Sequence, residues 1–183
     1  MTVRGTLVLV VGPSGAGKDS IIAGAAEHLA GERRIVFARR VITRPAKAGG
    51  ETHLAASPAE FAALRDADGL MLHWQAHGFE YGLPAARAAD LADGLCVVAN
   101  VSRTVVDEAR RRYPPVLVTA VTASPEIRAA RLASRGREQT TDIETRLRRA
   151  EALSVEADAV IANDGALGIA VTAFVGLLRT ALR

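Results

Sequence analysis

Thr6-Leu7-Val8-Leu9-Val10-Val11 leads directly into Gly12-Pro13-Ser14-Gly15-Ala16-Gly17-Lys18-Asp19-Ser20, and this stretch decides the fold of the chain. Its first part is rich in Val and Leu, which is typical of a buried strand. The glycines that follow let the backbone turn tightly and direct successive N–H groups inward, at the start of an apolar, helix-like run. The order of strand, glycine-rich loop and helix predicts a site that binds phosphate groups.

The spacing Gly12-x-x-x-x-Gly17-Lys18 is that of a phosphate-binding loop, in which the lysine reaches the outer phosphates of a nucleotide. We predict ATP as the ligand and Lys18 as a catalytic residue. The predicted ATP-binding residues of the loop are Gly12, Pro13, Ser14, Gly15, Ala16, Gly17, Lys18, Asp19 and Ser20. The alternative is a glycine-rich turn between strand and helix that carries an exposed lysine.

Asp19 departs from the loop pattern, which has Ser or Thr at this position as a ligand of Mg²⁺. A carboxylate also ligates Mg²⁺, directly or through water. The apolar run 95–101, which we predict as a central buried strand, contains Ala99-Asn100 near its end and offers no carboxylate for a metal. We therefore predict Mg²⁺ as a second cofactor, with Asp19 supplying the missing negative charge.

The composition indicates one globular domain over residues 1–183, because 49% of the residues are hydrophobic and 23% are charged. The net charge of +3 is too small to indicate a nucleic-acid partner by itself. The single cysteine, Cys96, lies in an apolar run and is expected to be a buried thiol. No signal-peptide pattern or membrane-length apolar run is found, so we expect a cytoplasmic protein without a membrane partner. The oligomeric state is left open, with a homodimer among the alternatives.

Helix-like and strand-like segments alternate along the chain, which predicts an α/β fold with a mainly parallel sheet covered on both faces. The predicted strands are 6–11, 35–42, 71–75, 95–101, 116–121 and 159–162. The predicted helices are 18–30, 58 to about 66, 84–93, 102–112, two that begin after capping signals at 124 and 141, and one at the C-terminus. The segment 34–93 is more polar, with a predicted hairpin after residue 71, and we interpret it as an insertion that binds the second substrate.

Basic side chains gather on and just before the predicted loop 43–51. Because arginine forks bind phosphate oxygens bidentately, such a group suits an acceptor that is itself phosphorylated. The predicted acceptor-binding residues here are Arg40, Thr43, Arg44 and Lys47. The alternative is a solvated basic surface. A further set either lines a polar pocket or serves only in packing: His73, Trp74, His77 and Tyr81.

Arginines also gather in the region from about 126 to 150. Residues 128, 131 and 135 are spaced i, i+3, i+7 and therefore share one face of a helix. Arginines on a mobile lid can neutralise a phosphoryl group during its transfer. The predicted lid arginines are Arg128, Arg131, Arg135, Arg137 and Arg146, of which we expect Arg131, Arg135 and Arg146 to be catalytic. The alternative is a solvated helix face.

These motifs together resemble the guanylate kinase superfamily over nearly the whole chain. The resemblance rests on the loop 12–18, Thr43-Arg44-Pro45, His77-Gly78 with Tyr81-Gly82, Arg131-Leu132, Arg146-Leu147 and Asn163-Asp164. It implies a P-loop NTPase fold, a three-layer sandwich with an acceptor-binding subdomain inserted at 34–93 and a small arginine-bearing lid. It also implies that Asn163 belongs to the ATP site, and that His73, His77 and Tyr81 belong to the acceptor site.

Within this superfamily the chain is more similar to the ribose 1,5-bisphosphate phosphokinases. The motifs are Gly17-Lys18-Asp19-Ser20, Arg40-Val41-Ile42-Thr43-Arg44-Pro45-Ala46, Gly49-Gly50-Glu51 and His73-Trp74-Gln75-Ala76-His77-Gly78. That family converts ribose 1,5-bisphosphate and ATP to 5-phosphoribosyl 1-diphosphate (PRPP) in phosphonate degradation.

Two departures from guanylate kinases support this resemblance. Guanylate kinases carry a Glu and a Ser or Thr that read guanine, and His73 and Leu83 stand at those positions here. A site that has lost both hydrogen-bonding groups is not built to read a base edge. Thr52 stands near the position of a tyrosine of that family, on a shorter loop. Guanylate kinase activity remains the alternative, followed by a binding module without catalysis.

Overall fold

The computed structural model describes residues 4–45, 51–134 and 155–182. A parallel sheet of five strands forms the centre, in the order β2-β7-β1-β8-β9. The strands are β1 (Leu7–Val11), β2 (Ile35–Phe37), β7 (Cys96–Asn100), β8 (Val116–Thr122) and β9 (Ala159–Ala162). Because β1 pairs with both β7 and β8, the loop that follows it emerges at the middle of the sheet.

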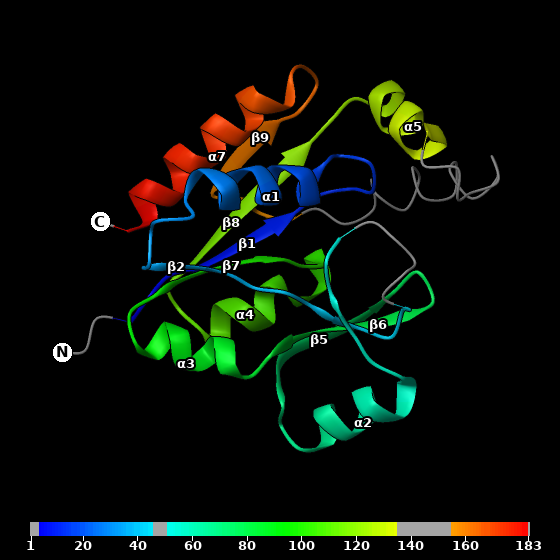
Figure 1. The fold of residues 1–183 in the computed structure, drawn as a ribbon, viewed down its shortest axis with the longest axis vertical. Helices are drawn as coiled ribbons and strands as arrows, with labels where there is room; N and C mark the ends of the chain where they lie inside the picture. The colour runs from blue at the N-terminus through cyan, green and yellow to red at the C-terminus, as the bar shows by residue number, and fades with distance from the viewer. Residues whose placement is uncertain (1–3, 46–50, 135–154, 183) are drawn as a thin grey trace.

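Helices cover both faces of this sheet (Figure 1). On one side lie α1 (Lys18–His28) and α7 (Leu167–Ala181), and on the other lie α3 (Ala86–Ala92) and α4 (Val106–Arg112). Alternate residues of β1 serve the two cores: Val8 and Val10 pack on the α1 and α7 side, and Leu7, Leu9 and Val11 on the other. All five are at most 1% exposed, so the sheet is buried on both faces, as the apolar run predicted.

A second sheet of four strands lies beyond α3 and α4, in the order β4-β3-β6-β5. Its strands are β3 (Val41–Ile42), β4 (Leu54–Ala55), β5 (Leu70–Ala76) and β6 (Phe79–Pro84). Helix α2 (Pro58–Asp66) covers its outer side, where Phe61 packs with Val41 and Leu70. Its inner side, which includes Ile42, Trp74 and Tyr81, joins the core beneath the main sheet.

Most of the predicted elements are confirmed. The capping box at α2 is present in full, because Ser57 Oγ accepts from the Glu60 N–H at 3.2 Å while Glu60 Oε2 accepts from the Ser57 N–H at 2.7 Å. The predicted hairpin after residue 71 is the antiparallel pair β5–β6. The predicted helix 102–112 begins as a 3₁₀ turn, Arg103–Val105, before α4.

The predicted single strand 35–42 is wrong. The chain leaves the main sheet after Phe37 and enters the second sheet at Val41, so the run is divided between β2 and β3. The local pattern is apolar on both sides of the break, and only the pairing partners, β7 for β2 and β6 for β3, separate the two strands. Strand β4 was not predicted, and α1 ends at His28, two residues before the predicted end.

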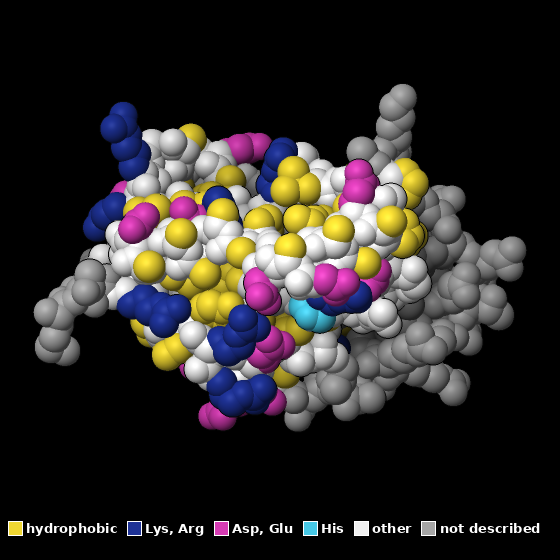
Figure 2. Space-filling view, turned by 90° about the horizontal axis from the view of Figure 1, so that it is seen from below, with side chains coloured by type: hydrophobic (Ala, Val, Ile, Leu, Met, Phe, Trp, Pro, Cys, Tyr) yellow, Lys and Arg dark blue, Asp and Glu magenta, His cyan; other side chains and the backbone are white. Residues whose placement is uncertain are grey.

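The region predicted to be a lid, from about 126 to 150, is described only as far as residue 134. Helix α5 (Pro125–Ser134) forms where Ser124-Pro125 predicted a helix start. The predicted capping box Thr141–Glu144 lies outside the described residues. None of the helices in the described part of the chain is long and apolar enough to cross a membrane. Figure 2 shows one face of the molecule, where basic and acidic side chains are interspersed among apolar ones.

Candidate active site

The loop between β1 and α1 has a backbone that only glycine adopts easily. Gly12 and Gly17 have φ values of 145° and 91°. A Cβ on Gly12 would lie 2.2 Å from the Val121 carbonyl oxygen, and one on Gly17 would lie 2.3 Å from Asn163 Nδ2. The loop is therefore pressed against β8 and the end of β9 as well as turned, which fixes the direction of its N–H groups.

Lys18 lies at the start of α1 with its ammonium group folded over the loop. Its Nζ donates to the carbonyls of Gly12 at 2.7 Å and Pro13 at 3.1 Å. Burial lowers the pKa of Lys18 from 10.5 to about 8; the Asp19 carboxylate opposes this shift, and the Arg40 and Arg103 charges add to it. A lysine whose charge is poorly solvated would be stabilised by an anion placed beside its ammonium group.

Asn163 and Arg131 hold the loop from the side of β9 and α5. Asn163 is 3% exposed, and its Nδ2 donates to the Ala16 carbonyl at 2.8 Å. Arg131 Nη2 donates to the Asn163 carbonyl at 2.9 Å, and its Nη1 lies 3.4 Å from the Ala16 carbonyl oxygen. The structure thus brings both predicted residues to the loop after β1, where they contact its backbone.

Asp19 and Asn100 are joined across the edge of the sheet. Asn100 Nδ2, at the carboxyl end of β7, donates to Asp19 Oδ1 at 2.6 Å. The same Asp19 oxygen lies 3.8 Å from Arg40 Nη2. The Asp19 side chain still exposes 42% of its surface, so its carboxylate remains accessible beside the loop.

Arg40 is 8% exposed and is held by a carboxylate that the sequence analysis did not single out. Its Nε donates to Glu51 Oε2 at 2.8 Å, and its Nη2 donates to Glu51 Oε1. The guanidinium also lies over the Tyr81 ring, 5.3 Å from the centroid, and Tyr81 stacks on Trp74 at 5.6 Å. The fork of Arg40 is therefore engaged within the protein.

Arg44 lies on the other side of the same carboxylate. Its Nη2 is 3.7 Å from Glu51 Oε1. The Arg44 side chain is 20% exposed, against 10% for the side chain of Arg40. Its Nε is buried and has no hydrogen-bond partner among the described residues. Arg44 therefore keeps donor capacity that Arg40 has used.

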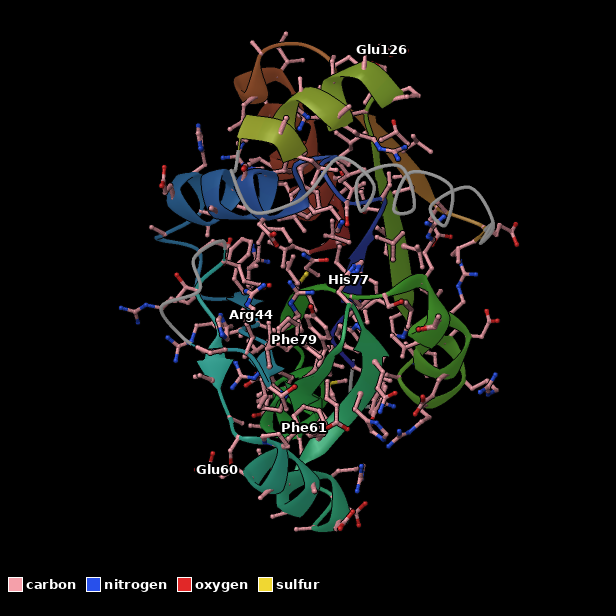
Figure 3. All side chains as sticks on the ribbon, turned by 90° about the vertical axis from the view of Figure 1, so that its right-hand side faces the viewer. Arg44, Glu60, Phe61, His77, Phe79 and Glu126 are labelled. Carbon is pink, nitrogen blue, oxygen red and sulfur yellow. The ribbon has the colours of Figure 1, made fainter. Side chains whose placement is uncertain are left out.

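The remaining candidate residues of the acceptor site differ in their surroundings. Thr43 Oγ1 accepts from the Glu80 N–H at 2.8 Å and so fastens β3 to β6. His73 is exposed on β5, and His77 lies at the hairpin turn with a φ of 53°. Figure 3 places Arg44 and His77 on the side of the second sheet nearer to α1, with Glu60 and Phe61 at α2 on the far side.

Sequence comparison identifies the family. The chain is 52% identical over 174 residues to the ribose 1,5-bisphosphate phosphokinase PhnN of Acidiphilium cryptum, covering 95% of this chain and 92% of that protein. It belongs to the ribose 1,5-bisphosphate phosphokinase PhnN family. Proteins of the same name from Rhodopseudomonas palustris (48% over 161 residues, 88% and 81% coverage) and Thiobacillus denitrificans (46% over 181 residues, 97% and 95%) agree. No protein-family model matches the chain.

The fold of this PhnN family member is shared with guanylate kinase. The guanylate kinase of Anaplasma phagocytophilum superposes with a TM-score of 0.72 at 19% identity, covering 98% of this chain and 86% of that one. A sugar kinase from Janibacter sp. superposes with a TM-score of 0.52 at 20% identity, covering 96% and 95%. At these identities the likeness concerns the fold alone, and it confirms the predicted fold class.

Three side chains of this PhnN protein were missed as site residues. Glu51 and His53 meet Arg44, and Arg103 follows Asn100 closely enough for its charge to lower the pKa of Lys18. The signal for Arg103 was its place just after a central strand, at the edge where ligands of parallel sheets bind. Glu51 was part of the motif Gly49-Gly50-Glu51 but was given no role, and His53 carried no signal, because the partners of both side chains are set by the fold. The predicted residues Lys47, Arg135, Arg137 and Arg146 lie outside the described residues.

Proposed function

We propose that this protein transfers the γ-phosphoryl group of ATP to ribose 1,5-bisphosphate, giving PRPP and ADP in phosphonate degradation. The observation that carries the proposal is the 52% identity to a ribose 1,5-bisphosphate phosphokinase over 95% of the chain. In the reaction an oxygen of the 1-phosphate bonds to the γ-phosphorus of ATP, the bond from that phosphorus to the β–γ bridging oxygen breaks, and ADP departs with the electron pair.

The donor side is built from the loop after β1. We propose that its N–H groups and Lys18 bind the ATP phosphates, because the glycine backbone leaves room for close approach and Lys18 lacks a full counter-charge. The residues fit Mg²⁺, which usually takes one or two carboxylates plus phosphate oxygens and water. Asp19, exposed at 42%, would hold it with Asn100 fixing its orientation. When bound, Mg²⁺ would neutralise charge on the phosphates.

The acceptor side is built around Arg44. The Arg44 side chain is more exposed than that of Arg40, and it lies 3.7 Å from Glu51 where Arg40 forms a bidentate pair, so we assign the direct phosphate contact to Arg44. Arg40, whose fork is bound by Glu51, would act by holding Glu51 and Asp19 in place. The predictions for Thr43, Lys47, His73, His77 and Tyr81 as acceptor-site residues stand as proposals.

The chemistry requires no general base, because an ionised phosphate has no proton to lose before it attacks. The barrier lies in charge repulsion and alignment between two anionic substrates. Cations around the loop reduce that repulsion: Lys18 directly, with Arg103 close enough to affect its pKa. The surroundings of Leu83 count against a base-reading site, since its side chain is fully buried in the core and His73, the other guanine-reading position, is exposed.

A coupled assay of ADP release tests the proposal, with ribose 1,5-bisphosphate and GMP supplied in parallel. We expect turnover with the sugar bisphosphate and a kcat/KM for GMP at least about 100-fold lower, because the hydrogen-bonding groups for guanine are missing. A preference for GMP would establish guanylate kinase activity instead. Absence of turnover with both acceptors and of ATP binding in a titration would indicate a binding module.

A further inference from the structure

His53 is a buried polar residue whose ring nitrogens contact Arg44 and Glu51 within the described part of the chain. It is 8% exposed and immediately precedes β4. Its Nε2 lies 3.0 Å from the Arg44 carbonyl oxygen, and its Nδ1 lies 3.2 Å from the Glu51 carbonyl oxygen. One ring therefore contacts the backbone of both residues whose side chains form the Arg44–Glu51 ion pair.

The ring also contacts the Arg44 side chain, with Nδ1 3.5 Å from Nη2. In the neutral tautomer protonated at Nε2, the ring donates to the Arg44 carbonyl and Nδ1 accepts from the Arg44 guanidinium. In that tautomer the 3.2 Å approach of Nδ1 to the Glu51 carbonyl oxygen is a contact between two acceptors and not a hydrogen bond. Backbone and side chain of Arg44 are then held by the same imidazole. A guanidinium held in this way loses less conformational entropy when it binds a phosphate.

We propose that His53 is the positioning residue for Arg44, holding its guanidinium in the orientation that receives the acceptor's phosphate. The inference rests on the proposed function, since it presumes a phosphorylated acceptor at Arg44. The described contacts of His53 with Arg44 and Glu51 are made by its ring nitrogens and not by its apolar atoms. Its neighbour Leu54 already anchors this end of the second sheet by donating from its N–H to the Arg40 carbonyl at 2.8 Å.

The test compares steady-state kinetics of His53→Phe and His53→Gln with the wild type, with each substrate varied in turn. Phe retains a ring and removes both polar contacts, whereas Gln retains a donor. We expect KM for ribose 1,5-bisphosphate to rise about tenfold or more in His53→Phe, with kcat and KM for ATP changed less than about twofold. His53→Gln should recover part of the loss.

His28→Phe is the matched control, because the His28 ring also bonds a backbone carbonyl, that of Gly24 at 2.8 Å, but on the exposed side of α1. It should leave all three constants unchanged. An unchanged KM for the sugar bisphosphate in His53→Phe, or an equal rise in KM for both substrates, would overturn the inference. If His53→Phe does not fold, His53→Ala, which also removes both polar contacts, replaces it, and an unchanged acceptor KM in that variant overturns the inference equally. Lack of wild-type turnover with the sugar bisphosphate would instead refute the proposed function.

Discussion

Asn100 Nδ2 donates a 2.6 Å hydrogen bond to Asp19 Oδ1, which connects the carboxyl end of β7 to the first turn of α1. The two residues depart together from the pattern of phosphate-loop enzymes, one by adding a carboxylate to the loop and the other by lacking it at the strand. Their contact is compatible with the Mg²⁺ site that we propose: Asp19 would supply the carboxylate from the loop, and the Asn100 amide on the strand would orient it.

Exchange of these two groups tests the assignment of Asp19 to the metal. Asp19→Ser should raise the Mg²⁺ concentration for half-maximal activity about tenfold or more, because the only carboxylate of the pair is lost. The double variant Asp19→Ser/Asn100→Asp restores a Ser on the loop and a carboxylate on the strand, and should recover most of the Mg²⁺ affinity. Activity titrated against Mg²⁺ at saturating ATP measures both effects.

The single variant Asn100→Asp is the control for this exchange. It places two carboxylates in contact, and their repulsion should lower the free energy of unfolding and change the Mg²⁺ concentration needed for half-maximal activity. Full activity and an unchanged Mg²⁺ requirement in Asp19→Ala would exclude Asp19 from the metal site.

Replacement of Lys18 by Ala should cost about 3–4 kcal/mol of transition-state stabilisation, by analogy with other preorganised electrostatic groups. The loss should appear in kcat as well as in kcat/KM, because the charge on the transferring group is redistributed in the transition state. Since Nζ bonds the loop carbonyls of Gly12 and Pro13 and no other group among the described residues, the fold should persist. A fall of less than about tenfold in kcat would contradict the catalytic role of Lys18.

The pH dependence of kcat/KM for ATP should report the lowered pKa of Lys18. The free enzyme has this pKa at about 8, so kcat/KM should fall above pH 8 as the ammonium loses its proton. Between pH 8 and 10.5 the folded protein binds fewer protons at Lys18 than the unfolded chain does, so this group's contribution to stability rises there. Deprotonation of Lys18 therefore does not unfold the protein, and unfolding from this cause cannot explain the fall in kcat/KM above pH 8. The Lys18→Arg variant stays charged at this pH. Its remaining kcat/KM for ATP should therefore not fall near pH 8.

The Arg40–Glu51 pair should be needed for stability. Glu51→Gln leaves a buried guanidinium without its bidentate partner, and we expect a loss of about 3 kcal/mol in the free energy of unfolding. The double variant Arg40→Met/Glu51→Leu should lose less than Glu51→Gln alone, because the more deeply buried cation, Arg40, is removed together with its partner and only the more exposed Arg44 loses its carboxylate. Denaturant unfolding measures both.

The exposed pair Arg34–Glu32, at 2.9 Å, gives the matched comparison for that experiment. Glu32→Gln should leave the unfolding midpoint almost unchanged, because water solvates the charge that remains. If the two Glu→Gln substitutions changed the free energy of unfolding equally, burial of Arg40 would not add to the cost of losing its partner.

The main sheet could be predicted from sequence because each of its central strands is a short run of Val, Leu and Ala bounded by clear turn or helix signals. The loop 12–20 could also be predicted, since its glycine spacing, its lysine and the elements that flank it are all close together in the sequence. Arg131 and Asn163 were assigned to function by motif, but their contacts with the loop backbone were not foreseen. The division of residues 35–42 between two sheets was missed, because both halves satisfy the same local pattern.

The sequence by itself determined the phosphate-binding loop, the α/β class and the family, all of which depend on residues that are neighbours along the chain. Only the tertiary structure decided which carboxylate meets which cation. Asn100 reaches Asp19 across 81 positions, and Glu51 lies between Arg40 and Arg44, because parallel strand ends and the second sheet converge beside the start of α1. Ion pairs and hydrogen bonds depend on distance in space, and sequence spacing does not record that distance between elements that meet only after folding.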